Sequence, residues 1–396
     1  VQPPDGNHLE ESGGDGGMIK RTLQELCLNI TDGKHGDCEN EENSGYYFIS
    51  CKDIFDGQIN YKNARQITKA DFEETHKRTM LEVDDILLTN SGTIGRMAFV
   101  TDREATTKTT FQKSVAIIKP DKQKVLPRYL YYQLQNCVPQ FINSSNGSAQ
   151  KNLLLSTMRT FQIEIEENCE KQEKIANTLS AYDDLIENNQ KQIKLLEEAA
   201  QRLYKEWFVD LHFPGHENTK IVDGVPEGWR RGLLKELISV NYGKDHKKVP
   251  DDGNIPVYGS GGLMRKCNKS LFSGEAVLIP RKGSLNNIMY VDETFWTVDT
   301  MFYATMKQPH TAVFVYFFVK AFDMYSMNIG AAVPSMTTKI LDAMDVVIPD
   351  KETLEKFDKY AKVYFNKIKT LQGQNEQLKT ARDLLLPKLM SGEVEV

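Results

Sequence analysis

Loops that combine glycine, serine and asparagine with lysine or arginine are the segments whose side chains could do chemistry. Examples are Asn90-Ser-Gly-Thr-Ile-Gly-Arg96 and Arg281-Lys-Gly-Ser-Leu-Asn-Asn287. Small residues let a backbone approach phosphates, arginine and lysine can bind guanine, and asparagine and glutamine can bind adenine in the major groove. Each single loop is equally well explained as an ordinary turn. Their recurrence favours nucleic-acid contact for the set.

The candidate contact residues fall into two groups, one in each half of the chain. The first group is Asn90, Ser91, Thr93, Arg96, Lys108, Lys113, Asn146, Gln150 and Lys151. The second group is Lys244, Lys247, Tyr258, Ser260, Arg265, Arg281, Lys282 and Ser284.

Motifs of catalysis are missing from the sequence. There is no G-x-x-x-x-G-K-[ST] loop, no H-E-x-x-H, no G-x-S-x-G and no Asn-Pro-Pro-aromatic tetrapeptide of the amino-methyltransferase kind. The glycines at Tyr258 to Gly262 lack the spacing of a dinucleotide fingerprint, and the six cysteines form no C-x-x-C pair. We therefore predict a protein without catalytic residues, metal or cofactor, whose cysteines are reduced and structural.

An internal repeat must position these loops. An apolar strand running into a glycine turn occurs at Asp85 to Gly92 and again at Ala276 to Gly283. An aromatic helix (130–134 and 315–319), an alternating strand (161–165 and 344–348) and a helix-capping residue (168 and 350) follow in the same order. The aromatic helices are better explained as core than as stacking platforms. The second copy has shorter loops, which suggests two sites with different preferences.

Each copy is followed by a heptad pattern sustained over about four heptads. The first pattern is Ile175, Leu179, Tyr182, Ile186, Asn189, Ile193, Leu196, Ala200 and Leu203. The second is Phe357, Ala361, Tyr364, Ile368, Leu371, Asn375, Leu378, Arg382 and Leu385. A stripe of this length occurring twice favours two helices that pack on each other over an amphipathic helix on its own domain.

Capping and breaking residues set the expected helix ends. Asn168 and Asp350 are good N-caps, and Pro387 should end the second helix near Leu386. The first helix, from about Glu170 to Phe208, would span roughly 58 Å at 1.5 Å per residue. With a globular domain between them, the helices should pack antiparallel, with the two copies at opposite ends of a rod and related by an approximate twofold.

Composition agrees with a soluble protein that has two packed cores. Hydrophobic residues make up 40% of the chain, and neither a membrane span nor a signal peptide is visible, so we expect a cytoplasmic location. Residues 1–17 carry four acids and no Lys or Arg, which predicts a disordered acidic tail with Met18 as the natural start. Without that tail the net charge of −6 is close to neutral, so total charge does not argue against a DNA partner.

The ends of the two helices carry a family resemblance. "AAQRLYKEWFVDLHFPG" followed by "GVPEGW", and "ARDLLLPKLMSGEVEV", resemble the conserved regions of the specificity subunit of type I restriction-modification systems. "DILLTNSGTIGR" and the run from "IPVYGSGGLM" to "FWTVDTMFY" resemble its target recognition domains. The similarity extends from Met18 onward. One departure is the second glycine turn, which continues Ser-Leu-Asn-Asn where the first has Thr-Ile-Gly-Arg.

The resemblance implies an α+β fold in which two mixed α/β recognition domains alternate with two long helices forming an antiparallel coiled coil. The expected segments are recognition domain 1 (18–167), first spacer helix (168–212), recognition domain 2 (213–349), and second spacer helix with C-terminal tail (350–396).

The same resemblance implies that each domain reads half of a split double-stranded DNA site. The helices would set the gap and dock two modification subunits, which bind S-adenosylmethionine and methylate adenine, and restriction subunits would add translocation and cleavage. The alternatives are a DNA methyltransferase with an unrecognised motif and a noncatalytic coiled-coil scaffold.

Overall fold

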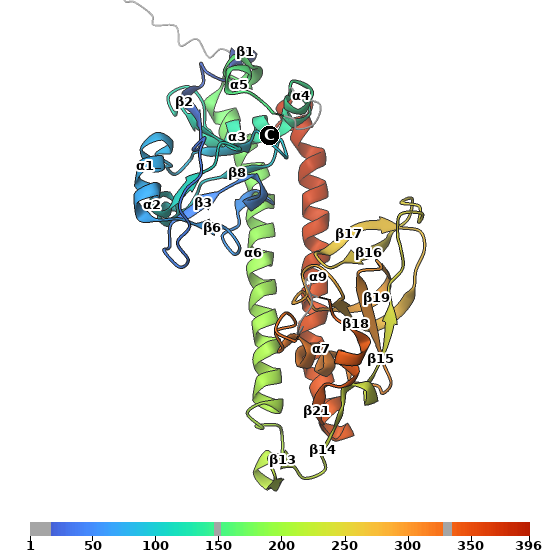
Figure 1. Ribbon diagram of the computed structural model, residues 1–396. Helices are drawn as coiled ribbons and strands as arrows, with labels where there is room; N and C mark the ends of the chain where they lie inside the picture. Colours follow the sequence, from blue (N-terminus) through green and yellow to red (C-terminus); the bar gives the residue numbers. More distant parts are fainter. Residues whose placement is uncertain (1–16, 146–151, 328–334) are drawn as a thin grey trace, which may run out of the picture. The chain divides into compact units, whose positions relative to one another are not determined.

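A computed structural model describes residues 17–145, 152–327 and 335–396 of the chain (Figure 1). The chain divides into two compact units. Unit 1 is built from residues 1–187 and 375–396, and unit 2 from residues 188–374. The predicted acidic tail lies outside the described residues except for Gly17.

Unit 1 combines short strands with small helices. Its strands are β1 (Met18–Thr22), β2 (Cys27–Asp32), β3 (Tyr47–Ile49), β4 (Ile54–Phe55), β5 (Gln58–Ile59), β6 (Arg65–Gln66), β7 (Ile86–Thr89), β8 (Met97–Phe99), β9 (Thr109–Phe111), β10 (Val115–Pro120) and β11 (Gln162–Glu166). Its helices are η1 (Cys51–Asp53), α1 (Lys69–Thr79), α2 (Arg103–Lys108), α3 (Pro127–Asn136), α4 (Val138–Asn143) and α5 (Leu155–Thr160).

A four-stranded antiparallel sheet in the order β2-β10-β7-β8 forms the centre of unit 1. Side chains alternate between its faces, as period-2 strands require. Ile86 and Leu88 pack with helix α3 in one core, whereas Leu87 and Ile117 belong to a second core on the other side. Because both faces are covered, all four residues of β7 are buried.

Unit 2 contains longer strands. They are β12 (Ile221–Val222), β13 (Val225–Pro226), β14 (Arg230–Leu233), β15 (Ile238–Tyr242), β16 (Ile255–Gly259), β17 (Gly262–Cys267), β18 (Phe272–Pro280), β19 (Met289–Thr297), β20 (Met301–Met306) and β21 (Asp345–Ile348). Its helices are η2 (His216–Asn218), η3 (Leu234–Glu236), α7 (Ala312–Lys320) and α8 (Thr338–Asp342).

The predicted repeat is confirmed by strand topology. The sheet of unit 2 runs β15-β20-β18-β19-β16-β17, and its first four strands are antiparallel and in the same order as those of unit 1. The pair β1 and β11 likewise corresponds to β14 and β21. Gly92 and Gly283 lie in the turns that follow the equivalent strands β7 and β18, with φ of 80° and 82°, a left-handed conformation that favours glycine. The aromatic helices α3 and α7 are buried core elements, as predicted.

Two 40-residue helices, α6 (Cys169–Phe208) and α9 (Lys351–Met390), each contribute to both units. In unit 1 the first part of α6 packs against the end of α9, through Ile175 and Leu179 with Leu386 and Leu389. In unit 2 the end of α6 packs against the start of α9, where the Phe208 and Phe357 ring centroids are 4.8 Å apart. The helices therefore run antiparallel, as predicted from the globular domain between them.

The predicted caps are present at both helix starts. Asn168 Oδ1 accepts hydrogen bonds from the backbone N–H groups of Glu170 and Lys171 at 2.8 and 3.2 Å. Asp350 Oδ1 accepts one from the Thr353 N–H at 2.9 Å, while its Oδ2 accepts the Trp229 indole N–H. These bonds satisfy donors that have no partner within a helix.

The expected end of the second helix near Leu386 is wrong. Helix α9 continues through Pro387 to Met390. Proline costs an intrahelical hydrogen bond, but one further turn places Leu389 and Met390, both 2% exposed, in the core of unit 1. Burial of two large apolar side chains offsets the missing bond.

Candidate nucleic-acid interface

One edge of the unit 1 sheet gathers several predicted contact residues. The start of β10 is paired with the ends of β2 and β7 on its two sides, with Ala116 opposite Asp32 and Val115 opposite Thr89. This register brings Asn90, Ser91 and Lys113 to the rim of one concavity of about 610 Å³. Three residues from two loops thus line a single concavity.

The rest of that concavity is lined by residues that the sequence did not reveal. They are Asp32, His35, Arg78 and Asn152 to Ser156. Asp32 is 5% exposed, and its two oxygens bind Arg78 at 2.5 Å and His35 at 2.9 Å. Arg78 comes from the last turn of α1, 46 positions after Asp32, so no local pattern links them. Asn146, Gln150 and Lys151, also predicted contacts, lie outside the described residues.

Asn90, a predicted contact residue, is buried. It is 4% exposed, and its backbone carbonyl accepts a hydrogen bond from Leu153 N–H at 2.8 Å. Among the described residues, no hydrogen-bond donor reaches its buried side-chain oxygen Oδ1. Direct contact with a DNA groove would therefore require a ligand group to enter the concavity.

The β7–β8 turn presents Thr93 and Arg96 as exposed side chains. Gly95 has φ of 93°, and a Cβ there would lie 2.5 Å from Cγ1 of Val138, so the turn needs glycine. The Arg96 backbone N–H donates to Thr89 Oγ1 at 2.9 Å. The backbone is therefore fixed while the Arg96 guanidinium, 3.5 Å from the Cys51 carbonyl, extends from the turn.

Lys108 does not join this group. It ends α2, where its ammonium binds Glu104 Oε1 at 2.9 Å, and this hydrogen bond raises the Lys108 pKa. Strand β9 separates Lys108 from Lys113 along the chain. Lys108 does not line the concavity with Asn90, Ser91 and Lys113, so its contact with DNA stays a prediction.

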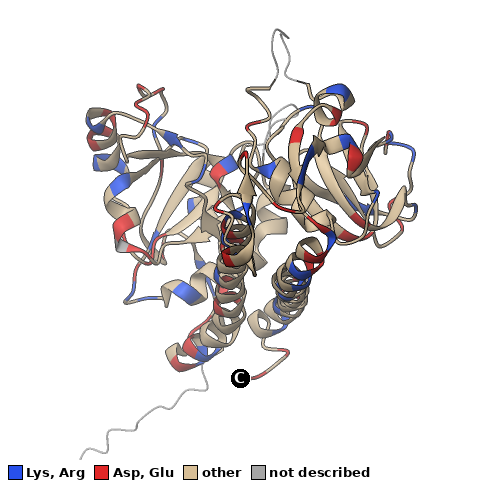
Figure 2. Cartoon of the chain, turned by 90° about the horizontal axis from the view of Figure 1, so that it is seen from below, with Lys and Arg blue, Asp and Glu red and all other residues tan. Residues whose placement is uncertain are grey.

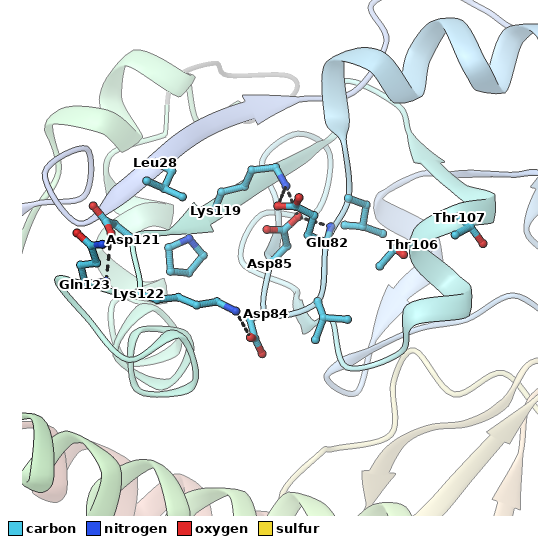
Figure 3. Close-up of a pocket in the computed structure, with 13 residues that line it drawn as sticks. Leu28, Glu82, Asp84, Asp85, Thr106, Thr107, Lys119, Asp121, Lys122 and Gln123 are labelled. Carbon is cyan, nitrogen blue, oxygen red and sulfur yellow. Dashed lines mark hydrogen bonds and ion pairs between the residues drawn. The ribbon is translucent and has the colours of Figure 1, made fainter.

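Another concavity of unit 1, about 830 Å³, lies at the opposite end of β7 and is acidic (Figure 3). Lys119 binds Asp85 at 2.7 Å and Glu82 at 3.2 Å, and Lys122 binds Asp84 at 2.6 Å. Carboxylates neutralise both cations, so this pocket is unsuited to phosphate. The edge with Ser91 and Lys113 is the better DNA surface.

In unit 2 two predicted loops pack directly together. The Asn287 amide donates to the Ser260 carbonyl at 2.9 Å, and a Cβ on Gly283 would lie 2.5 Å from Ser260 Oγ. The Tyr325 hydroxyl donates to the Gly283 carbonyl at 2.9 Å. Lys282 and Ser284, exposed on the second loop, therefore share one surface with Ser260.

Two other predicted contacts in unit 2 serve the fold. The Tyr258 hydroxyl donates a hydrogen bond to Glu293 Oε1 at 2.5 Å. Burial, and to a lesser extent the Glu293 carboxylate, raises the Tyr258 pKa. Arg265 donates to the backbone carbonyls of His246 and Val249 at 2.6 and 2.9 Å. Both polar groups are thus already engaged with the protein, which sequence spacing alone could not show.

Three more cations of unit 2 were predicted contacts: Lys244, Lys247 and Arg281. Lys244 and Lys247 are exposed, and the loop that carries them is fixed by a hydrogen bond from the Trp296 indole to the Lys244 carbonyl. The Arg281 guanidinium lies 5.5 Å from the Tyr242 ring centroid. Basic and acidic residues are interspersed over the chain (Figure 2), so local position matters more than total charge.

Two searches of the described residues bear on other kinds of site. Over residues 17–145, 152–327 and 335–396, no three His, Cys, Asp or Glu side chains are grouped to hold a metal. Within the same ranges, no helix has both the length and the apolar run of a membrane span.

Comparison with known proteins gives one consistent family. The model of the type I restriction modification DNA specificity domain matches residues 19–198 and 226–380. The type I restriction enzyme MjaIX specificity subunit of Methanocaldococcus jannaschii is 26% identical over 394 residues, covering 88% of this chain and 87% of its own. The HindI specificity subunit of Haemophilus influenzae is 22% identical, covering 70% and 80%.

Among solved structures, the type I restriction-modification S subunit from M. genitalium has a similar fold. It aligns with a TM-score of 0.56 at 18% identity, covering 96% of this chain and 98% of its own. The predicted class, two mixed α/β domains with two long antiparallel helices, is confirmed.

Proposed function

We infer that this chain, which belongs to the type I restriction modification DNA specificity family, is the subunit that reads DNA sequence for a methyltransferase and endonuclease assembly. The observation that carries this function is the duplicated sheet. Both units have the same four-strand order, and both place loops with basic and amide residues after the equivalent strands β7 and β18. Similar frames with different side chains suit two half-sites of different sequence.

The chain would have no catalytic role and bind no cofactor. Two modification subunits would dock on α6 and α9, which are rich in lysine and glutamate, and restriction subunits would complete the assembly. These partners would supply S-adenosylmethionine binding, methyl transfer and cleavage. The cytoplasmic location, the domain boundaries and the role of the helices as a spacer stay predictions.

The direct test is to express this chain with its modification subunits and sequence the methylated genomic DNA. We expect one bipartite motif, with two fixed half-sites separated by a constant number of unspecified bases. Methylation of a single continuous motif, or none that depends on this chain, would contradict the proposal.

A methyltransferase activity of the chain itself is the first competing function. Incubation of the purified chain with labelled S-adenosylmethionine and DNA distinguishes it from a reading subunit. We expect no label in the DNA until the modification subunits are added. Transfer by the chain alone would support the enzyme.

A scaffold without a role in DNA recognition is the second competing function. Replacing Arg96 and Lys282 with alanine should weaken DNA binding by the assembled methyltransferase and reduce the slope of log affinity against log salt by about 0.9 for each phosphate that is no longer neutralised. Glu104→Ala, which removes an acid beside Lys108, is a control outside the proposed surface. Equal salt slopes for all variants would support a scaffold.

A further inference from the structure

We propose that Arg78, held by the buried carboxylate of Asp32, reads a guanine in the half-site bound by unit 1. The proposal rests on the function proposed above and names a specificity-determining residue for it. Neither residue belongs to the loops that the sequence indicated.

The geometry fixes one edge of the Arg78 guanidinium. Asp32 Oδ1 accepts a hydrogen bond from its Nη2 at 2.5 Å, and Asp32 Oδ2 binds His35 Nε2 at 2.9 Å. The Asp32 side chain is 7% exposed, whereas that of Arg78 is 51% exposed and lines the concavity. Among the described residues, no second acceptor binds Arg78, so its other N–H donors are available to a ligand.

Guanine is the base whose major-groove edge suits such a donor. It presents two acceptors, O6 and N7, which a planar guanidinium binds together, while its paired cytosine presents an N4–H donor. Arginine carries only donors, so Arg78 can bind the two acceptors of guanine but offers no acceptor to the cytosine N4–H group.

Unit 2 has a related arrangement at the equivalent position. Phe302 of β20 lies opposite Tyr242, as Ala116 of β10 lies opposite Asp32, so Tyr242 is the counterpart of Asp32. Arg281, which follows β18 as Asn90 follows β7, lies over the Tyr242 ring at 5.5 Å. In each unit an arginine thus contacts the last residue of the equivalent strand, Asp32 of β2 or Tyr242 of β15, although the two arginines come from different segments.

Lys113 on the same rim serves a different purpose. It is exposed in the turn between β9 and β10, and its backbone N–H donates a hydrogen bond to the Lys34 carbonyl at 3.0 Å. A flexible ammonium is a point charge suited to phosphate, whereas a held guanidinium has a fixed donor geometry. Arg78→Lys keeps the positive charge and removes the planar guanidinium with its paired N–H donors. The substitution therefore distinguishes recognition of a base from binding of a phosphate.

The test uses the full assembly with its modification subunits. For Arg78→Lys we expect the preference for guanine at one position of one half-site to fall roughly 5- to 150-fold, the range for one bidentate base contact. The other half-site should keep its sequence. Arg281→Lys should relax only that other half, and Lys113→Ala should weaken all sites without changing any base preference.

Several results would overturn the inference. They are an unchanged motif for Arg78→Lys, a uniform loss of methylation with every preference kept, or relaxation at a position other than guanine. If Arg78→Lys does not fold, Asp32→Asn serves instead, since it replaces the carboxylate that holds Arg78 and His35 by a single amide oxygen, and it must relax the same position. If the wild-type assembly methylates no bipartite site, the proposed function itself fails.

Discussion

Asp183 is expected to be a major contributor to the stability of unit 1. Its carboxylate accepts a hydrogen bond from the Tyr132 hydroxyl of α3 at 2.6 Å and forms an ion pair with Arg382 near the end of α9. One side chain on α6 therefore joins three helices of the same unit. Asp183→Ala would leave both partners without this acceptor.

The expected destabilisation follows from burial. Asp183 and Arg382 side chains are 21% and 20% exposed, so water only partly replaces the missing carboxylate. Breaking a fully buried pair costs about 3–5 kcal/mol. Arg382 retains Asp383 at 2.8 Å, so we expect a decrease of about 2–3 kcal/mol in the free energy of unfolding of unit 1. For a urea slope of about 2–3 kcal/mol/M, the midpoint falls by about 1 M.

The chain offers a separate probe for each unit. All three tryptophans, Trp207, Trp229 and Trp296, lie in unit 2, so tryptophan fluorescence follows that unit alone. Cys27 and Cys137 are buried in the core of unit 1, where burial raises the pKa of both thiols, and their labelling in urea reports its unfolding.

The matched control is Asp184→Ala, which changes the next residue, whose side chain is 71% exposed. We expect Asp183→Ala to lower the urea midpoint for thiol labelling while the fluorescence midpoint stays in place, and Asp184→Ala to move neither by more than about 0.2 M. Equal effects of the two variants would refute the reasoning.

Two further predictions concern unit 1. Gly95→Ala should lower the free energy of unfolding by at least about 2 kcal/mol, since φ of 93° is costly for alanine and the new Cβ would contact Val138. The control is Gly45→Ala, at φ of 77° with open space around it, which should lower it by only about 1–2 kcal/mol. Equal urea midpoints for the two variants would contradict a role for the Val138 contact. Burial raises the Asp85 pKa to about 6, although the Lys119 ammonium is 2.7 Å away. The folded state therefore binds this proton more tightly than the unfolded chain does. The resulting contribution to the free energy of unfolding is complete below about pH 4, and up to about 3 kcal/mol of it should be lost as the pH rises through 6. Asp85→Asn should flatten the dependence of the urea midpoint on pH. If the variant and the wild-type protein show the same dependence, Asp85 is not the group that titrates.

Most of the frame could be predicted because its signals are local. The repeat depends on strands that end in glycine at Gly92 and Gly283, and the helix starts depend on single capping residues. Pro387 was misjudged because a local rule about proline ignores the core that the following turn fills.

The site was less predictable because its contacts connect distant segments. Asp32 and Arg78 are 46 positions apart and meet only through the packing of α1 beside β2, so neither could be recognised from spacing. Tyr258 lies in β16 and Arg265 in β17, and their hydrogen-bond partners Glu293 and Val249 are distant in sequence. Sequence pattern indicates where a loop is, whereas the sheet decides which of its side chains remain available.

The division of unit 1 between two stretches of chain has a consequence for biosynthesis. Its core needs Leu386, Leu389 and Met390, which a ribosome makes only after residues 188–374. At about 5–20 residues per second, that delay is roughly 10–40 s. The unit that emerges first is therefore the last to be completed, and until then the nascent chain exposes the apolar side of α6 that α9 later covers. A chaperone working during translation would meet this protein at that face.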